Sequence, residues 1–126
     1  MREILFRAKQ HYTKEWLYGA VVKDGDECLI MVGEPDGLYK QKMTVVEEST
    51  VGQFTGLVDR NGKRIFEGDI MLLGDGTKRK TVIEYDSLRA QFVARLFDKN
   101  SIRMAVSFWS AGEIIGNIHD NPELLS

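Results

Sequence analysis

The chain has 126 residues, the length of one ordinary domain, and its 43% hydrophobic and 29% charged residues are typical of a globular protein. Its formal net charge of -2 is spread without a strongly charged block, which argues against a dedicated nucleic-acid binder. No apolar run approaches the length of a membrane-spanning helix, and the charged start lacks the pattern of a secretory signal. The single cysteine, Cys28, cannot form an internal disulfide. We therefore expect a cytoplasmic protein with no membrane partner.

The N-terminal part reads as short strands. Residues 4–8 alternate between apolar and polar side chains, which predicts a first strand with one packed face. Residues 16–22 and 27–32 flank the turn signal at residues 23–26 and predict a β-hairpin. A β-branched run at residues 43–46 predicts one further strand.

The central stretch, residues 51–73, carries two chain reversals. Asp59, Asn61 and Gly62 have the residue types of a tight turn, and Glu67, Gly68 and Asp69 break the chain again before the apolar run at residues 70–73. A turn of this kind needs positive φ at its glycine. We predict that Gly62 and Gly68 are structural requirements and not parts of a ligand loop.

The C-terminal part predicts more strands and one short helical turn. Residues 81–85 and 91–97 have strand composition, although residues 87–97 also fit a helical stripe; the hairpin is favoured. Further strands are predicted over residues 102–109 and 113–118. Asn121 and Pro122 resemble an N-cap followed by proline at the first helical position, so residues 122–125 predict a terminal helical turn.

Closely spaced short strands with glycine-bearing turns predict a mainly β fold. We expect the C-terminal half to form a small antiparallel SH3-like barrel, with the N-terminal strands packed beside it. The chain is treated as one domain, residues 1–126, with a subdivision at residues 1–50 and 51–126 as the alternative. The five barrel strands are expected at residues 65–73, 81–85, 91–97, 102–108 and 113–118.

Three blocks of sequence carry a family resemblance. MREILFRA at residues 1–8, QFTGL with DRNGKRIFEGDI at residues 53–70, and IGNIHDNPELL at residues 115–125 occur in this order. Together they resemble the YopX-like family of bacteriophage and prophage proteins over essentially the whole chain. That family is defined by its sequence and not by an activity. The resemblance therefore implies a phage origin and a bacterial host cell, and it implies no particular reaction.

The sequence gives only weak indications of catalytic or metal-binding residues. Glu67 and Asp69 would share one face of a strand, as acid-base pairs or cation ligands do, but a Gly-Asp step entering a strand is more typical of a turn. His11, His119 and Cys28 are too far apart in sequence to form a local metal-ligand pair. We expect no catalytic residue, no metal and no cofactor.

Two groups of residues are candidates for binding partners. Aromatic Phe108 and Trp109 form a candidate protein interface if they lie on an exposed tip. The basic residues concentrate in two segments that could converge in a small barrel and contact nucleic acid or another acidic partner, although a solvated surface is favoured. These basic residues are Arg60, Lys63, Arg64, Lys78, Arg79 and Lys80.

The leading functional hypothesis is a non-enzymatic protein-interaction module, with homo-oligomer formation as one form of it. The alternative is a nucleic-acid-binding small β-barrel that uses the two basic segments. A small metal-dependent hydrolase is the second alternative, and it would need a site assembled from residues distant in sequence.

Overall fold

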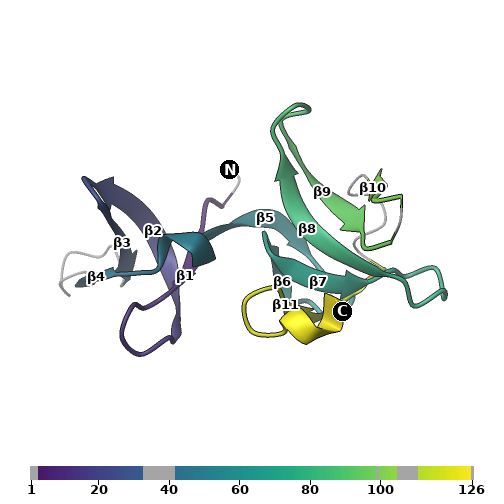
Figure 1. The fold of residues 1–126 in the computed structure, drawn as a ribbon, viewed down its shortest axis with the longest axis horizontal. Helices are drawn as coiled ribbons and strands as arrows, with labels where there is room; N and C mark the ends of the chain where they lie inside the picture. The colour runs from purple at the N-terminus through teal and green to yellow at the C-terminus, as the bar shows by residue number, and fades with distance from the viewer. Residues whose placement is uncertain (1–2, 33–41, 99, 105–110, 126) are drawn as a thin grey trace. The chain divides into compact units, whose positions relative to one another are not determined.

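The computed structural model describes residues 3–32, 42–98, 100–104 and 111–125. It forms two compact units, Met1–Phe54 and Thr55–Ser126, drawn as ribbons in Figure 1. Strands dominate, and the described helices are short 3₁₀ turns. The strands form two antiparallel sheets, in the orders β4-β3-β2-β1-β5-β6 and β10-β9-β8-β7-β11. The elements of the first unit are β1 (Phe6–Lys9), β2 (Trp16–Asp24), β3 (Glu27–Val32), β4 (Lys42–Val45) and η1 (Glu48–Thr50), with β5 (Gly52–Val58) crossing the boundary between the units.

The N-terminal unit is a curled sheet around a small core. The predicted hairpin is confirmed as β2 and β3, with Gly25 at φ +61° in the turn. After β4 the chain returns to β1, since the Glu47 N–H donates to the Lys9 carbonyl at 2.9 Å. The inner face of the sheet therefore encloses a cluster of apolar side chains. Its buried members are Ala8, Cys28, Ile30 and Val46.

The C-terminal unit contains an antiparallel meander to which the last strand is added at the β7 edge. Strand β7 pairs with β8 on one side and with β11 on the other. Its buried core contains Ile65, Met71, Ile83 and Ala94. The strands of this unit are β6 (Arg64–Phe66), β7 (Asp69–Leu72), β8 (Lys80–Asp86), β9 (Gln91–Leu96), β10 (Arg103–Met104) and β11 (Glu113–Asn117).

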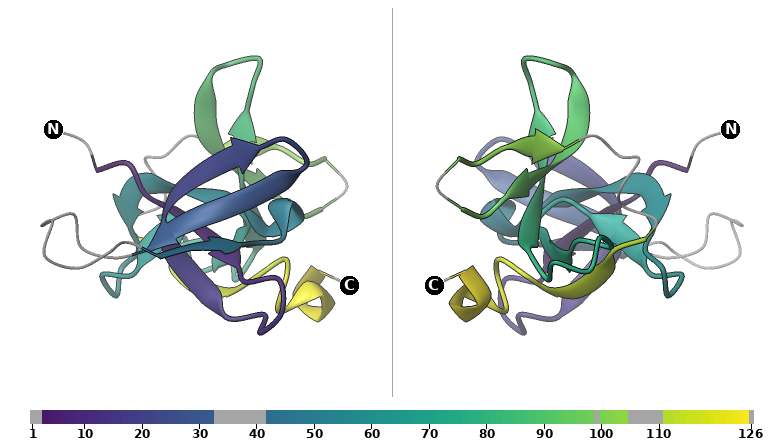
Figure 2. Two further views of the ribbon diagram at one scale, coloured as in Figure 1. Left: turned by 90° about the vertical axis from the view of Figure 1, so that its left-hand side faces the viewer. Right: turned by 90° about the vertical axis from the view of Figure 1, so that its right-hand side faces the viewer.

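The ambiguous segment after residue 86 forms a hairpin and not a helix. Strand β9 pairs with β8 over its full length, from Gln91 opposite Asp86 to Leu96 opposite Thr81 (Figures 1 and 2). Ala90 adopts φ +54° in the connecting turn. Hairpin formation places Ala94 and Phe92 on the core side of the sheet, which a helical stripe through the same residues would not do.

The predicted single strand over residues 65–73 was wrong in one respect. The chain breaks at Glu67-Gly68, so β6 belongs to the first sheet and β7 to the second. Gly68 has φ +90°, and the Asp69 Oδ2 accepts a hydrogen bond from the Phe66 N–H at 2.8 Å. This local turn ends one strand and starts the next in the other sheet.

The mainly β fold and the terminal turn predicted from the sequence are present, whereas the predicted barrel is seen only as antiparallel sheet. The fold is mainly β, and no closed barrel is found among the described strands. The terminal turn is η3 (Pro122–Leu125), a 3₁₀ helix. The Asn121 side chain accepts a hydrogen bond from the Asn117 N–H at 3.2 Å, which fixes the turn against the end of β11.

We expect valine at Gly62 or Gly68 to lower the free energy of unfolding by about 1 to 3 kcal/mol, because both glycines have positive φ that a β-branched residue adopts only with strain. At Gly68 the added side chain also approaches the His119 ring, whose Nε2 lies 3.5 Å from the position of a Cβ. Denaturant melts of Gly62→Val, Gly68→Val and Gly68→Ala measure these costs.

Lys63→Val is the matched control, since Lys63 is exposed beside Gly62 and is not among the positive-φ residues. Its unfolding should stay within about 0.5 kcal/mol of the parent. Glycine variants that melt like Lys63→Val would contradict a structural role for these glycines.

Candidate functional site

The turn after β5 is organised by one buried carboxylate. Asp59 is 4% exposed, and its Oδ1 accepts hydrogen bonds from the Asn61 and Lys63 N–H groups, each at 2.9 Å. Its Oδ2 accepts from the Ile114 N–H of β11 at 3.0 Å. The turn predicted at Asp59, Asn61 and Gly62 is therefore present, and its first residue also holds the last strand. Sequence spacing gave no sign of this second contact, which joins residues 55 positions apart.

These contacts set the protonation of Asp59. Burial, the largest influence, would raise the pKa of this carboxyl. The N–H groups of Ile114, Lys63 and Asn61 outweigh it and, with the Lys63 charge, lower the pKa below its ordinary value. A carboxylate held ionised by backbone donors is a structural anchor, and its lone pairs face the chain's own amides.

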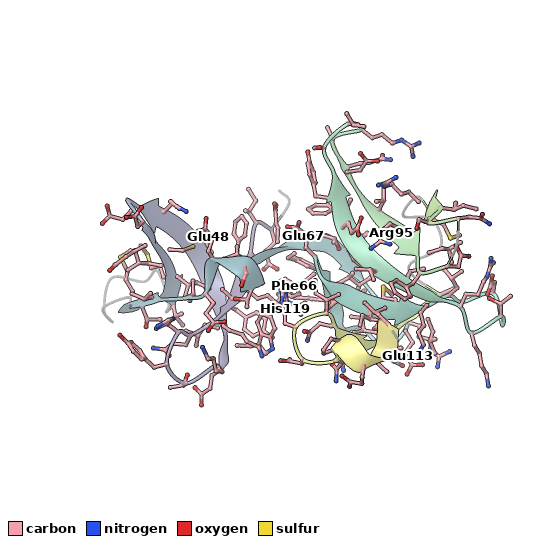
Figure 3. All side chains as sticks on the ribbon, viewed as in Figure 1. Glu48, Phe66, Glu67, Arg95, Glu113 and His119 are labelled. Atoms are coloured by element: carbon pink, nitrogen blue, oxygen red, sulfur yellow. The ribbon has the colours of Figure 1, made fainter. Side chains whose placement is uncertain are left out.

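Glu67, Gly68 and Asp69 also form a structural turn. Asp69 is 2% exposed and accepts from the Phe66 N–H. The Gly68 N–H donates to the Ile83 carbonyl at 2.8 Å, and the Gly68 carbonyl accepts from the Ile118 N–H at 2.9 Å. Glu67 and His119 are both half-buried and are labelled in Figure 3. Glu67 belongs to this turn, and His119 lies beside Gly68 in space. The Asp69 geometry is that of a turn and not of a paired acid and base.

The two basic segments lie at the same end of the five-stranded sheet. Glu113 at the start of β11 is opposite Leu72, and Leu72 is opposite Lys80 at the start of β8. The Arg60 N–H donates to the carbonyl of Gly112, next to Glu113. The register thus brings both segments together, which sequence alone left open.

Much of this positive charge is used within the unit. Arg60 pairs with Glu113 at 2.9 Å, and the Lys80 ammonium donates to the Leu124 carbonyl at 2.7 Å. Arg79 pairs with Asp75 at 2.9 Å. The Thr77 hydroxyl and N–H, and then Arg79, hold the pKa of Asp75 at about 2. Lys63, Arg64 and Lys78 are also exposed cations of the two segments.

The aromatic residues near these segments do not offer a stacking platform there. Phe54 is 7% exposed and Phe66 is 3% exposed, so both are buried. Tyr85 is 49% exposed but lies at the opposite end of β8 from Lys80, where its ring meets Phe92 edge-on at 5.4 Å. The proposed aromatic interface at Phe108 and Trp109 lies outside the described residues.

A different surface emerges on the N-terminal unit, and sequence reasoning missed it. Register places alternate residues of β2, β3 and β4 on the face opposite the core, and their side chains are apolar. Val22 is 38% exposed and Met43 is 48% exposed. Within the described residues, the core cluster of this unit takes no member from this face. We call it the outer apolar face; it consists of Ala20, Val22, Leu29, Met31, Met43 and Val45.

The signal for this face was present in the sequence. Residues 16–22 read WLYGAVV, a run that is apolar at nearly every position. An antiparallel strand with one wet face alternates between apolar and polar residues, whereas a continuous apolar run indicates that both faces are apolar. The run therefore pointed to a second surface besides the core.

Residues with catalytic potential are dispersed or buried. Among the described residues, no group of three or more His, Cys, Asp or Glu side chains is placed to hold a metal ion. Cys28 is buried in the N-terminal core, and burial raises the pKa of its thiol. Arg95, labelled in Figure 3, is paired with Glu84 of the neighbouring strand at 2.6 Å. In the part of the chain that the structure describes, no helix is long and apolar enough to cross a membrane.

Comparison with known proteins decides the family. Residues 5–126 match the family described as YopX protein. The chain belongs to the YopX family. The match spans both compact units, so the family is defined by the N-terminal and C-terminal units together. The resemblance seen in the three sequence blocks is thereby confirmed.

One solved structure supports the fold of this YopX family member. The crystal structure of protein EF1440 from Enterococcus faecalis is 25% identical, with a TM-score of 0.61, and the match covers 100% of each chain. A search of curated proteins gave no match. The similarity therefore extends across the whole fold and carries no activity with it.

We expect Asp59→Asn to destabilise the protein at neutral pH by about 1 to 3 kcal/mol, because an amide has only one acceptor oxygen for the three N–H donors that the buried carboxylate accepts from. The folded pKa of Asp59 is lowered from 3.8, so its stabilisation is present above pH 3.8 and is lost as the pH falls through the folded pKa. Urea unfolding at pH 7 and pH 3 measures both effects, and the variant should lose less stability on acidification than the parent.

Asp98→Asn provides the control, because Asp98 also accepts two backbone N–H bonds, from Asn100 and Ser101, but in an exposed turn. We expect a change within about 0.5 kcal/mol for this variant. Equal effects of the two substitutions would show that Asp59 is an ordinary turn residue.

Proposed function

We propose that this YopX family member is a non-enzymatic protein-interaction module that binds a protein partner through its outer apolar face. The observation that carries the proposal is the exposure of Val22 and Met43 on the outer apolar face. The described residues that lie opposite them on the neighbouring strands are apolar as well. Contiguous apolar surface on a soluble protein marks an interaction site more often than scattered single residues do. In keeping with the family resemblance, the partner is expected in a bacterial host cell.

The absence of an enzyme-like constellation among the described residues is consistent with this proposal. The strongly held carboxylate Asp59 is directed at backbone donors, and the Cys28 thiol is buried. Metal analysis of protein purified without chelators tests the metal-dependent hydrolase: a stoichiometric metal would favour it over the interaction module.

We further infer that the C-terminal unit is an SH3-like barrel in its strand order. In the sheet order β11-β7-β8-β9-β10, the last strand of the chain, β11, lies next to β7, the first strand of the meander. That order supports the barrel expected from sequence. Such barrels serve as scaffolds for surface contacts in many functional contexts, so the fold itself does not choose a partner.

We expect Val22→Glu to abolish capture of the partner, because a buried unpaired carboxylate in an apolar interface costs several kcal/mol. Tagged parent and variant are used to capture proteins from lysogenic host cells, with quantitative mass spectrometry as the readout. Leu88→Glu is the matched control: Leu88 is 96% exposed on the β8–β9 turn and lies off the outer apolar face.

Proteins retained by the parent and Leu88→Glu but lost with Val22→Glu support the proposed surface. Identical captured sets for all three proteins contradict it. Both variants should melt close to the parent, since each replaces an exposed side chain.

The second candidate is binding of nucleic acid at the basic end of the C-terminal unit. The observation that favours it is the register that brings residues 60–64 and 78–80 to one end of the sheet. The internal pairs of Arg60 and Arg79 and the buried positions of Phe54 and Phe66 weaken it. This candidate would make phosphate contacts without a stacking surface beside them.

For that candidate we expect binding of oligonucleotides that strengthens as salt is lowered, and Lys63→Glu with Lys78→Glu should weaken it at least tenfold and reduce its salt dependence. Fluorescence anisotropy with single- and double-stranded oligonucleotides at 20 and 200 mM salt measures this. Arg89→Glu, exposed on the β8–β9 turn, is the control. Undetectable binding at 20 mM salt would remove the candidate.

A further inference from the structure

We propose that the outer apolar face is a self-association surface, on which a second copy of the chain packs with its strands antiparallel to those of the first. This inference rests on the proposed function, because it names the partner of the same face. Two observations support it, the register of β2, β3 and β4 and the charges at the two ends of the face. The strands can be followed in Figure 2.

The face is built in rows that run across the three strands. Val22 is opposite Leu29, which is opposite Val45. In the next row Ala20 is opposite Met31, which is opposite Met43. Directly opposed residues of an antiparallel pair lie on the same face of the sheet. The two rows therefore make a continuous aliphatic band, and its two methionines can adapt their shape to a facing surface.

The band has an acidic end. The next row beyond Val22 and Leu29 is the pair Asp24 and Glu27, at the β2–β3 turn, and both side chains are exposed. Neither carboxylate belongs to the core side of the sheet, because each is two residues along its strand from a member of the band.

The other end of the band is aromatic and basic. The row after Ala20 contains Tyr18, opposite Arg7 of β1, and the following row contains Trp16, opposite Lys9. The guanidinium of Arg7 lies 4.7 Å from the centre of the Trp16 ring, and the Lys9 ammonium lies 5.5 Å from it. Arg7 is buried at 7% exposure, so the half-buried Lys9, held against the Trp16 ring, is the cation that this end of the face can present to a partner.

This asymmetry selects one arrangement of two copies. Two identical faces can pack around a two-fold axis that lies between them, either parallel or perpendicular to the strands. The parallel axis places the acidic end of one copy over the acidic end of the other, which is repulsive. The perpendicular axis reverses the strands and places Asp24 of one copy near Tyr18 and Lys9 of the other, so that unlike charges meet twice.

The size of the face predicts a weak dimer. Two rows cross all three strands, which are about 4.8 Å apart, and the other three rows extend the face along β2 at a spacing of about 6.6 Å, so the face measures at most roughly 15 Å by 27 Å. This is below the roughly 800 Å² per partner of a standard stable interface. We therefore expect a weak dimer whose population depends on protein concentration. Two sheets that pack face to face lie about 10 Å apart, which interdigitated Val, Leu and Met side chains fill.

The test is a charge exchange measured by sedimentation velocity from 10 to 500 µM protein. We expect the parent to show a concentration-dependent monomer-dimer equilibrium. Asp24→Lys or Lys9→Glu alone should weaken dimerisation at least tenfold, because each places like charges over one another. The double variant, which exchanges the two charges, should recover dimerisation to within about threefold of the parent.

Glu123→Lys is the control for Asp24→Lys, since it makes the same change in net charge on the C-terminal unit, and it should dimerise like the parent. Thermal melts of every variant establish that it is folded. A single variant that is unfolded is replaced by Asp24→Asn, which should weaken dimerisation by a smaller factor.

Three results would overturn the inference. They are a parent that stays monomeric at 500 µM, a Val22→Glu variant that dimerises as the parent does, and a double variant that dimerises no better than the single variants. A monomeric parent together with loss of a captured host protein in Val22→Glu would leave the proposed function standing with another protein as the partner. A dimeric parent with no captured host protein would support self-association as the interaction itself.

Discussion

The C-terminal unit depends on a carboxylate that accepts hydrogen bonds from three backbone N–H groups, in the place of water. Asp59 holds its own turn through Asn61 and Lys63 and holds the start of β11 through Ile114. Without this contact, the register of β11 on β7 would depend on side-chain packing, and the pairing is irregular between Ile114 and Gly116. One side chain therefore stabilises both a local turn and the pairing of the last strand with the sheet. The basic end of the sheet follows from the same contact, because the start of β11 brings Glu113 to Arg60.

Local structure was largely predictable because it depends on neighbouring residues. The β2–β3 hairpin, the glycines with positive φ at positions 62 and 68, and the terminal turn all follow from short patterns. The hairpin formed by β8 and β9 was harder, since residues 87–97 satisfy strand and helix periodicities alike. Pairing across the hairpin resolved it, because β8 presents Ile83 opposite Ala94.

The assignment of strands to sheets and the use of each face could not be read from the sequence. The break at Gly68 was visible, but its effect of sending β6 and β7 to different sheets depends on partners far along the chain. Likewise, the concentration of basic residues was visible, whereas their ion pairs with Glu113 and Asp75 required the fold. The outer apolar face was missed because WLYGAVV was interpreted as an ordinary strand, when its lack of alternation indicates two apolar faces.

Strand β5 contains the boundary between the two compact units, since Phe54 belongs to the first and Thr55 to the second. Its beginning pairs with β1, where Gln53 lies opposite Phe6, and its end leads into the Asp59 turn. The chain thus passes from one unit to the other within a single strand. Insertion or deletion of a single residue there would flip the side chains of one half to the opposite face.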